Sequence, residues 1–256
     1  MTHPLFDISG RTALVTGSSR GIGRALARGL LEAGATVVLN GRDEDRLEAA
    51  RSELVGETGG TVHAVSFDVT DPRDVVRGIA TVEDAVGGLD ILVSNTGAQH
   101  RAPFLEFPDQ EWYRLLDTNL SSAFLVGREV GRRMVPRGSG KIVNVTSLQS
   151  EVARPGIAPY AATKGALTML TKGMCADLAP AGIQVNALGP GYIETELTEA
   201  LVADAEFTAW VVGRTPAGRW GKVEDLVGAL LFLCSPASDF VNGQTVYVDG
   251  GMLAVL

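Results

Sequence analysis

The feature that most constrains the fold of this chain is a strand, a glycine-rich turn and a helix close to its beginning. Residues 12–16 (TALVT) form a short apolar strand pattern, and Gly17, Gly21 and Gly23 follow before a helical pattern begins. A second strand pattern, residues 36–40 (TVVLN), completes a βαβ unit of about 30 residues. Glycines let a backbone approach a pyrophosphate, and the N–H groups at a helix start attract its charge. The spacing differs from G-x-G-x-x-G, so a purely structural glycine turn is the alternative to a dinucleotide site.

Strands and helices continue to alternate along the rest of the chain. Apolar strand patterns occupy residues 61–67, 90–94, 142–147, 183–188 and 245–248, and helical patterns include residues 72–86, 108–134, 158–179 and 223–233. Near-continuous apolar strands are typical of a parallel sheet that helices cover on both faces. Because no low-complexity stretch or linker interrupts the alternation, the sequence predicts a single α/β domain over residues 1–256.

The composition limits the partners of such a domain. The formal net charge of -8 at pH 7 disfavours nucleic acid, because phosphate binding needs a basic surface. Cys175 and Cys234 lie in apolar helical patterns and predict buried thiols rather than a disulfide. Neither a signal-like start nor an uncharged apolar run of about 18 residues is present, so secretion and membrane spanning are not expected. A cytoplasmic protein is predicted.

Three polar side chains with complementary chemistry gather near the middle of the chain. Ser147 ends a β-branched apolar run and should stand at the mouth of a buried strand. Tyr160 and Lys164 are spaced to share one face of a helix. A phenol has an unperturbed pKa of about 10, and a nearby ammonium is the expected means of lowering it. The alternative is that these common residues are unrelated surface positions.

The end of the second strand indicates which dinucleotide would bind. An acidic residue there would accept hydrogen bonds from the ribose hydroxyls of NAD, but the chain reads Asn40-Gly41-Arg42. Arg42, with Arg20 from the glycine turn, could instead bind a 2′-phosphate, which favours NADP. A solvated arginine at a helix start is the alternative for Arg42. Asp68, just beyond the third strand, could accept from the adenine amino group or cap the next turn.

Two further segments carry candidate functional residues. Residues 192–221 hold no strand pattern, include Trp210 and Trp220, and predict a substrate loop that acts as a lid. Asn119 is a poor helix former inside the helical pattern of residues 108–134, which predicts a local kink or a buried hydrogen bond. Several arginines between residues 128 and 137 predict a solvated or subunit-facing stripe.

With these motifs in order, the chain resembles the short-chain dehydrogenase/reductase family over essentially its whole length. The resemblance rests on Thr16-Gly17-x3-Gly21-x-Gly23, on the Ser-x12-Tyr-x3-Lys spacing, and on Asn186-Ala187-x2-Pro190-Gly191-x-Ile193-x-Thr195. It implies a Rossmann-type, doubly wound sheet of seven parallel strands flanked by helices on both faces. It also implies a homotetramer formed through two long central helices. One departure is Ser94-Asn95-Thr96-Gly97 in place of Asn-Asn-Ala-Gly, which predicts altered packing near the cofactor.

The resemblance implies roles for individual residues. Tyr160 would act as general acid or base, and Ser147 would donate to the substrate oxygen. Lys164 would lower the pKa of Tyr160 and hold the nicotinamide ribose, while Asn119 would anchor a water that relays the proton. No metal-ligand cluster is evident, and hydride chemistry with these groups needs none. The residues implied to contact NADP, with NAD less favoured, are Gly17, Ser19, Arg20, Gly21, Ile22, Gly23, Arg42, Asp68, Val69, Asn95, Gly97, Tyr160, Lys164, Pro190, Gly191, Ile193 and Thr195.

Loop fragments at residues 97–101, 153–155, 189–193 and 219–221 resemble family members that act on open-chain sugar acids. A small-molecule substrate of this kind, a sugar acid or polyol, needs a cation and several hydrogen-bonding groups. The candidates are His100, Arg101, Gln149 and Arg154, and a surface or loop-anchoring role is the alternative for each. A reductase of 3-oxoacyl groups on a carrier protein is the first rival function. A non-catalytic NADPH-binding sensor is the second.

Overall fold

The computed structural model describes residues 3–255, and its centre is a sheet of seven parallel strands in the order β3-β2-β1-β4-β5-β6-β7. The predicted doubly wound, seven-stranded sheet is thereby confirmed. The strand order reverses between β1 and β4, and doubly wound sheets bind ligands beyond the carboxyl ends of strands at such a reversal. The strands are β1 (Thr12–Val15), β2 (Thr36–Gly41), β3 (Val62–Ser66), β4 (Ile91–Ser94), β5 (Gly140–Val145), β6 (Ile183–Pro190) and β7 (Thr245–Val248).

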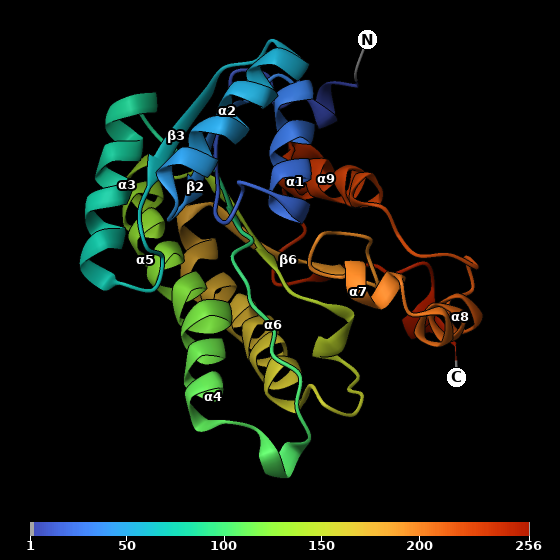
Figure 1. Cartoon of the computed structure of the whole chain (residues 1–256). Helices are drawn as coiled ribbons and strands as arrows, with labels where there is room; N and C mark the ends of the chain where they lie inside the picture. Colours follow the sequence, from blue (N-terminus) through green and yellow to red (C-terminus); the bar gives the residue numbers. More distant parts are fainter. Residues whose placement is uncertain (1–2, 256) are drawn as a thin grey trace.

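Helices cover both faces of the sheet, which explains why its inner strands are apolar throughout. On β1, Ala13 and Val15 belong to the core on one face and Leu14 to the core on the other, and all three side chains are 0% exposed. Figure 1 shows α1 beside α9 and α3 beside α5. One face is covered by α1 (Gly21–Glu32), α2 (Glu44–Thr58) and α9 (Val227–Cys234), and the other by α3 (Pro72–Val86), α5 (Ser122–Met134) and α6 (Ala158–Leu178).

The helical pattern over residues 108–134 is divided by an irregular turn. An α-helix, α4 (Asp109–Leu116), leads into a π-helical turn, η3 (Asp117–Ser121), and α5 continues beyond it. Asn119 lies in this turn and is 1% exposed. The predicted irregularity and the predicted buried asparagine therefore coincide. Single π turns within α-helices occur frequently at functional sites.

Residues 192–221, all of which the structure describes, contain two short helices and no strand. These are α7 (Glu199–Val202) and α8 (Ala205–Arg214), which lie on the side of the molecule opposite α3 (Figure 1). The segment packs on an apolar cluster of its own that includes Val211, Trp220 and Leu148. Leu148 follows the end of β5, so this cluster connects the segment to the carboxyl end of the sheet.

Several boundaries differ by one or two residues from the sequence prediction, and two of the differences have a clear cause. β6 extends to Pro190 instead of residue 188, because pairing with β7 continues as far as Pro190 opposite Val248. The helix predicted over residues 223–233 begins with a 3-10 turn, η7 (Val223–Leu226), before α9. Within residues 3–255, none of the helices combines the length and the apolar character that crossing a membrane requires.

Candidate active site

The glycine turn between β1 and α1 brings two stretches of backbone close together. Gly17 and Gly21 have φ angles of +61° and +56°, in the left-handed region that side chains disfavour. A Cβ on Gly23 would lie 2.4 Å from the carbonyl oxygen of Gly17, so no side chain fits there. The turn therefore leads into the N-terminal N–H groups of α1 with little side-chain bulk, an arrangement suited to a phosphate.

Asn95 connects this turn to the end of β4. Its side-chain amide donates to the carbonyl oxygens of Thr16 and Gly17, both at 3.0 Å. Its backbone N–H also donates to the hydroxyl of Thr16 at 3.0 Å. Thr96, the departure from the family pattern, has a buried hydroxyl with no hydrogen-bond partner among residues 3–255. That hydroxyl would lie 3.0 Å from a Cβ placed on Gly17, so Thr96 packs directly against the glycine turn.

The end of β2 carries the charges expected to select the cofactor. Asn40 is 1% exposed, and its amide donates to the backbone oxygens of Val65 and Phe67, which leaves it unavailable to a ligand. The side chain of Arg42 is 77% exposed, and its guanidinium lies 3.8 Å from the carboxylate of Asp68. Asp68 also caps the following turn through its other oxygen. Arg42 is therefore accessible, whereas Asp68 is largely occupied within the protein.

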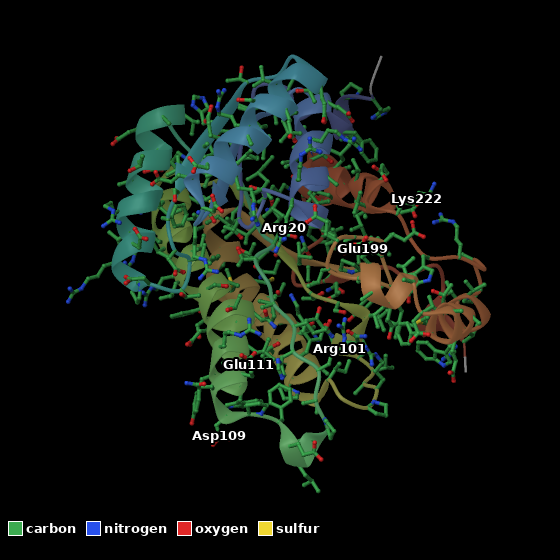
Figure 2. All side chains as sticks on the ribbon, in the orientation of Figure 1. Arg20, Arg101, Asp109, Glu111, Glu199 and Lys222 are labelled. Carbon is green, nitrogen blue, oxygen red and sulfur yellow. The ribbon has the colours of Figure 1, made fainter. Side chains whose placement is uncertain are left out.

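The other cofactor candidates around the glycine turn differ in accessibility. Arg20 lies at the start of α1 (Figure 2), and its guanidinium pairs with the carboxylate of Glu196 at 3.3 Å. Ser19 and Arg20 line a cavity of about 650 Å³ between α1, α2 and residues 194–196. Ile22 packs against the core and Val69 is part of it. This cavity adjoins the glycine turn, and Tyr160 is not among the residues that line it.

The segment that follows β6 begins at the carboxyl edge of the sheet, as the glycine turn after β1 does. Pro190 ends the strand, and a Cβ on Gly191 would lie 2.6 Å from a backbone atom, so the segment is closely packed from its start. Ile193 is buried, and the backbone N–H of Thr195 donates to the hydroxyl of Thr198 at 2.9 Å. Gly97, which follows β4, is exposed and lies near Asn119 and Lys164.

Ser147 stands just past the end of β5, as its position in the sequence predicts. It is 7% exposed and caps a 3-10 turn, η5 (Leu148–Ser150), by accepting a hydrogen bond from the backbone N–H of Gln149 at 3.2 Å. The Ser147 hydroxyl in turn donates to the side-chain oxygen of Gln149 at 3.4 Å. These two contacts fix the position of the hydroxyl. At 3.4 Å, the bond that it donates to Gln149 is weak enough to be replaced by a bond to a better acceptor.

Tyr160 and Lys164 share one face of α6, and burial dominates the pKa of both groups. Burial raises the pKa of Tyr160 above its ordinary value, and a hydrogen bond with Ser147 and the charge of Arg101 oppose this only in part. Lys164 is 4% exposed, and its ammonium donates to the carbonyl oxygen of Val145 at 2.8 Å. Burial lowers the pKa of Lys164 to about 8. In both groups desolvation favours the neutral form.

Asn119 is held in the π turn by three hydrogen bonds. Its side-chain oxygen accepts from the backbone N–H of Ala98 at 2.7 Å. Its amide donates to the Ala98 oxygen at 3.0 Å and to the Thr163 hydroxyl at 3.1 Å. These contacts connect the loop after β4 with α6 at the level of Tyr160. Asn119 therefore fixes the position of the loop that begins at Gly97.

Two arginines from separate loops, Arg101 and Arg154, lie near each other. The Arg101 pKa is lowered by partial burial and by the positive charge of Arg154, and the phenols of Tyr192 and Tyr160 counteract this. Figure 2 shows Arg101 between the ribbons of α6 and α7. Arg101 donates to the side chain of Gln99 and Arg154 to a backbone oxygen, and within residues 3–255 neither forms an ion pair with a carboxylate. The Arg154 guanidinium also stacks over Phe207 at 5.2 Å.

His100 is directed to α4 instead. Its Nδ1 lies 3.4 Å from the carboxylate of Glu111, and its ring meets the edge of Phe107 with the ring centroids 5.3 Å apart. Glu111, on α4 (Figure 2), also pairs with Arg114. Of the four substrate candidates, Arg101 and Arg154 thus lie near each other, and Gln149 reaches the same region through Tyr192. The contacts of His100 are those expected of a residue that anchors its loop.

Tyr192 also lies at this centre, although the sequence motifs do not single it out. Its hydroxyl accepts a hydrogen bond from the amide of Gln149 at 3.2 Å. The signals that could have identified it are its position directly after Pro190-Gly191 and the aromatic residues that follow at 207, 210 and 220. A local pattern cannot predict which of these rings meet.

The arginines of α5 do not form a free basic surface. Arg132 and Arg133 pair with Glu129, and Arg133 also pairs with Glu83 at 2.7 Å. Arg137 lies 3.5 Å from the same Glu83. Three of the arginines predicted to form a stripe are therefore paired with carboxylates within the protein, which lowers the positive charge of this surface. Among the described residues, no group of three or more histidine, cysteine or acidic side chains is arranged to hold a metal ion.

Comparisons with known proteins match this architecture along the whole chain. A family model described as enoyl-(acyl carrier protein) reductase matches residues 17–253. Gluconate 5-dehydrogenase from Gluconobacter oxydans (strain 621H) is 56% identical, over 100% of both chains. The 5-keto-D-gluconate 5-reductase of Escherichia coli (strain K12) is 48% identical, over 99% of this chain and 100% of that protein.

A solved structure agrees with the sequence comparisons. The crystal structure of a gluconate 5-dehydrogenase from Burkholderia cenocepacia J2315 in complex with NADP and tartrate is 53% identical, with a TM-score of 0.96 over 99% of each chain. The glycine turn, the order of the strands and the grouping of Ser147, Tyr160 and Lys164 are consistent with this similarity. The chain belongs to the short-chain dehydrogenase/reductase family.

Proposed function

We propose that this protein is an NADP-dependent oxidoreductase that interconverts gluconate and 5-keto-gluconate. The observation that carries the substrate assignment is the pair of neighbouring guanidiniums, Arg101 and Arg154, which have no carboxylate partner among the described residues, with Arg101 close to Tyr160. The carboxylate of a substrate would form ion pairs with them and balance their positive charge. The names of the relatives from Gluconobacter oxydans and Escherichia coli support the same substrate.

The residues around the glycine turn fit NADP. Gly23 leaves no room for a side chain where a pyrophosphate would approach, and Arg42 offers an exposed guanidinium where a 2′-phosphate would lie. Gly97, Thr195 and the Pro190-Gly191 segment would border the nicotinamide. When bound, NADPH supplies a hydride for reduction and NADP⁺ accepts one in oxidation.

Tyr160 would transfer the proton that accompanies the hydride. Its raised pKa keeps the phenol protonated at neutral pH, which suits it to donate to the carbonyl oxygen during reduction. Ser147 would donate a second hydrogen bond to that oxygen as negative charge develops there. In oxidation the same groups act in reverse, and Tyr160 must accept the proton from the substrate hydroxyl. We expect oxidation to become faster as the pH rises towards the pKa of Tyr160.

Lys164 and Asn119 would connect Tyr160 to solvent. The Lys164 ammonium is 5.9 Å from the centre of the Tyr160 ring and is fixed by the Val145 oxygen, from which it can also reach a ribose hydroxyl. Asn119, whose side chain is fixed by the backbone of Ala98, would help to hold a relay water. The proton that leaves Tyr160 in reduction would be replaced along this path.

The cofactor preference gives a testable consequence. Replacing Arg42 with alanine is expected to raise the KM for NADP about 10- to 100-fold, since a charge-assisted hydrogen bond to phosphate is lost. The KM for NAD should change little. Arg77→Ala is the matched control, because its side chain is 76% exposed and also pairs with an aspartate. An unchanged ratio of the two KM values in Arg42→Ala would refute this role of Arg42.

The carboxylate site gives a second consequence. We expect Arg101→Gln and Arg154→Gln each to raise the KM for gluconate about tenfold or more, because each removes a charged donor. The KM for NADP is the internal control and should stay constant. Sorbitol, a polyol with no carboxylate, should be affected much less than gluconate by either substitution. If both variants keep the wild-type KM for gluconate, the carboxylate assignment is wrong.

Residues 192–221 would act as the substrate loop of a single domain that spans the chain. Their apolar cluster packs beside Ser147 through Leu148, which supports a position over the reacting groups. A cytoplasmic homotetramer is part of the same proposal. Exposed apolar side chains on the helices expected to pair, Phe124 on α5 and Met169 on α6, support that assembly.

The first alternative is a 3-oxoacyl-[acyl-carrier-protein] reductase, which would need a basic surface to dock its acidic carrier. The pairing of Arg132, Arg133 and Arg137 with Glu129 and Glu83 argues against such a surface on α5. The second alternative is an NADPH-binding sensor without catalysis. The grouped Ser147, Tyr160 and Lys164 argue against it. Assays of gluconate, sorbitol and acetoacetyl thioesters with both cofactors would distinguish all three functions.

A further inference from the structure

A chain of hydrogen bonds runs from Ser147 to the substrate loop. The Ser147 hydroxyl donates to the side-chain oxygen of Gln149, and the Gln149 amide donates to the hydroxyl oxygen of Tyr192 at 3.2 Å. Gln149 is 9% exposed, so both contacts are shielded from water. Tyr192 uses only an acceptor position in this chain. In the part of the chain that the structure describes, no acceptor takes its O–H, which remains available to a ligand.

The ring of Tyr192 is held on several sides. Phe207, Trp210 and Trp220 each meet it nearly edge to face, with centroid distances of 5.7, 5.8 and 5.6 Å. Such contacts favour one orientation of the ring beyond the effect of burial alone. The two helical partners, Phe207 and Trp210, lie on α8. The hydroxyl is therefore presented from a rigid aromatic setting and does not depend on a flexible loop.

The free O–H lies near the reaction centre, because Gln149 joins the Tyr192 hydroxyl to that of Ser147. The Tyr192 phenol is also close enough to Arg101 to affect the pKa of its guanidinium. It thus lies near both a group that would bind the reacting oxygen and a group that would bind the carboxylate. An open-chain sugar acid carries its hydroxyl groups in this interval, between the reacting carbon and the carboxylate.

We propose that Tyr192 is a specificity residue that donates a hydrogen bond to a substrate hydroxyl near the reacting carbon, with Gln149 fixing the phenol in place. This inference rests on the proposed function and adds a residue that recognises a hydroxyl group of the substrate. Tyr192 recognises the polyol part of the substrate, whereas Arg101 and Arg154 bind its carboxylate. A site built around a hydrogen bond of this kind discriminates against substrates that lack the hydroxyl.

The test compares two substrates that differ only in their hydroxyl groups. 5-Oxohexanoate has the carbon chain, the carboxylate and the C5 ketone of 5-keto-gluconate but none of its hydroxyls. Tyr192→Phe keeps the ring and its aromatic contacts and removes only the phenolic oxygen. We expect kcat/KM for 5-keto-gluconate to fall about tenfold and the value for 5-oxohexanoate to stay within about twofold of wild type. If 5-oxohexanoate turns over too slowly, its inhibition constant replaces kcat/KM.

Controls separate recognition from a structural role. Tyr113→Phe alters an exposed tyrosine on α4 and should leave both substrates unaffected. The emission of Trp210 and Trp220 should be unchanged in Tyr192→Phe if the aromatic cluster is intact. An equal loss on both substrates would show that Tyr192 only supports the loop, and no loss on either would also overturn the inference. If wild-type protein does not reduce 5-keto-gluconate at all, the proposed function fails and this inference falls with it.

Discussion

Replacing Tyr160 with phenylalanine is expected to lower kcat for 5-keto-gluconate reduction by about 10²- to 10⁴-fold, the usual contribution of a positioned acid or base. The phenol is the group that Ser147 contacts and that burial keeps protonated at neutral pH. Because phenylalanine fills the same space on α6, the substitution removes the proton donor and little else. Steady-state rates with NADPH, followed by the loss of its absorbance, measure the effect.

Binding of NADPH distinguishes this loss of chemistry from a loss of folding. The dissociation constant for NADPH, measured by fluorescence titration, should stay within a few-fold of wild type in Tyr160→Phe. The small residual activity should also lose the pH dependence of the wild-type enzyme. A variant that keeps most of its activity, or one whose pH profile is unaltered, would remove Tyr160 from the reaction.

Replacing Ser147 with alanine should cost about 10²- to 10³-fold in kcat, by analogy with the removal of one donor from an oxyanion site. The hydroxyl is ready for this role because its bond to Gln149 is long, at 3.4 Å, and can be given up to a developing negative charge. The effect should appear in kcat more than in KM, since the interaction is strongest in the transition state. Rates over a range of 5-keto-gluconate concentrations separate the two constants.

Ser150 offers a matched control within the same short turn. Its hydroxyl donates to the backbone oxygen of Ser147 at 2.7 Å and is not aimed at Tyr160 in that contact. We expect Ser150→Ala to keep kcat within a few-fold of wild type. Equal losses in the two variants would mean that the turn needs its hydroxyl groups for shape, and would contradict a direct role for Ser147.

The parts of this structure that local patterns determine could be predicted from the sequence. Apolar runs such as residues 12–16 and 36–40 become inner strands because both of their faces are buried. The glycine turn was also predictable, because its glycines meet local requirements: Gly17 takes a positive φ angle and Gly23 has no space for a Cβ. The spacing of Tyr160 and Lys164 also placed both residues on one helical face.

Features that depend on distant partners could not be predicted in this way. The raised pKa of Tyr160 follows from its burial in the folded chain, which the local spacing of residues does not report. His100 looked like a substrate ligand, but its ring faces Glu111. Tyr192 became recognisable only when Phe207 and Gln149 were brought to it by the fold. In each case the deciding contact joins segments that the chain brings together only on folding.

The surface that could have docked an acidic carrier protein shows that charge, too, depends on distant partners. The arginines near residue 133 read as a basic stripe, because sequence alone does not reveal where their counter-ions lie. In the folded chain Glu129 is 6% exposed and accepts from Arg132 and Arg133, while Glu83 on α3 reaches Arg133 as well. Pairing within α5 and between α5 and α3 therefore reduces the free positive charge.

The most direct test of the central claim is to identify the product that wild-type protein forms from gluconate and NADP⁺. The reaction should generate NADPH and, by carbon-13 NMR, a single ketone at C5 of the six-carbon acid. The same preparation should be much less active with NAD⁺ and with acetoacetyl thioesters. Formation of a ketone at another carbon, or no formation of NADPH from gluconate at any pH tested, would contradict the account.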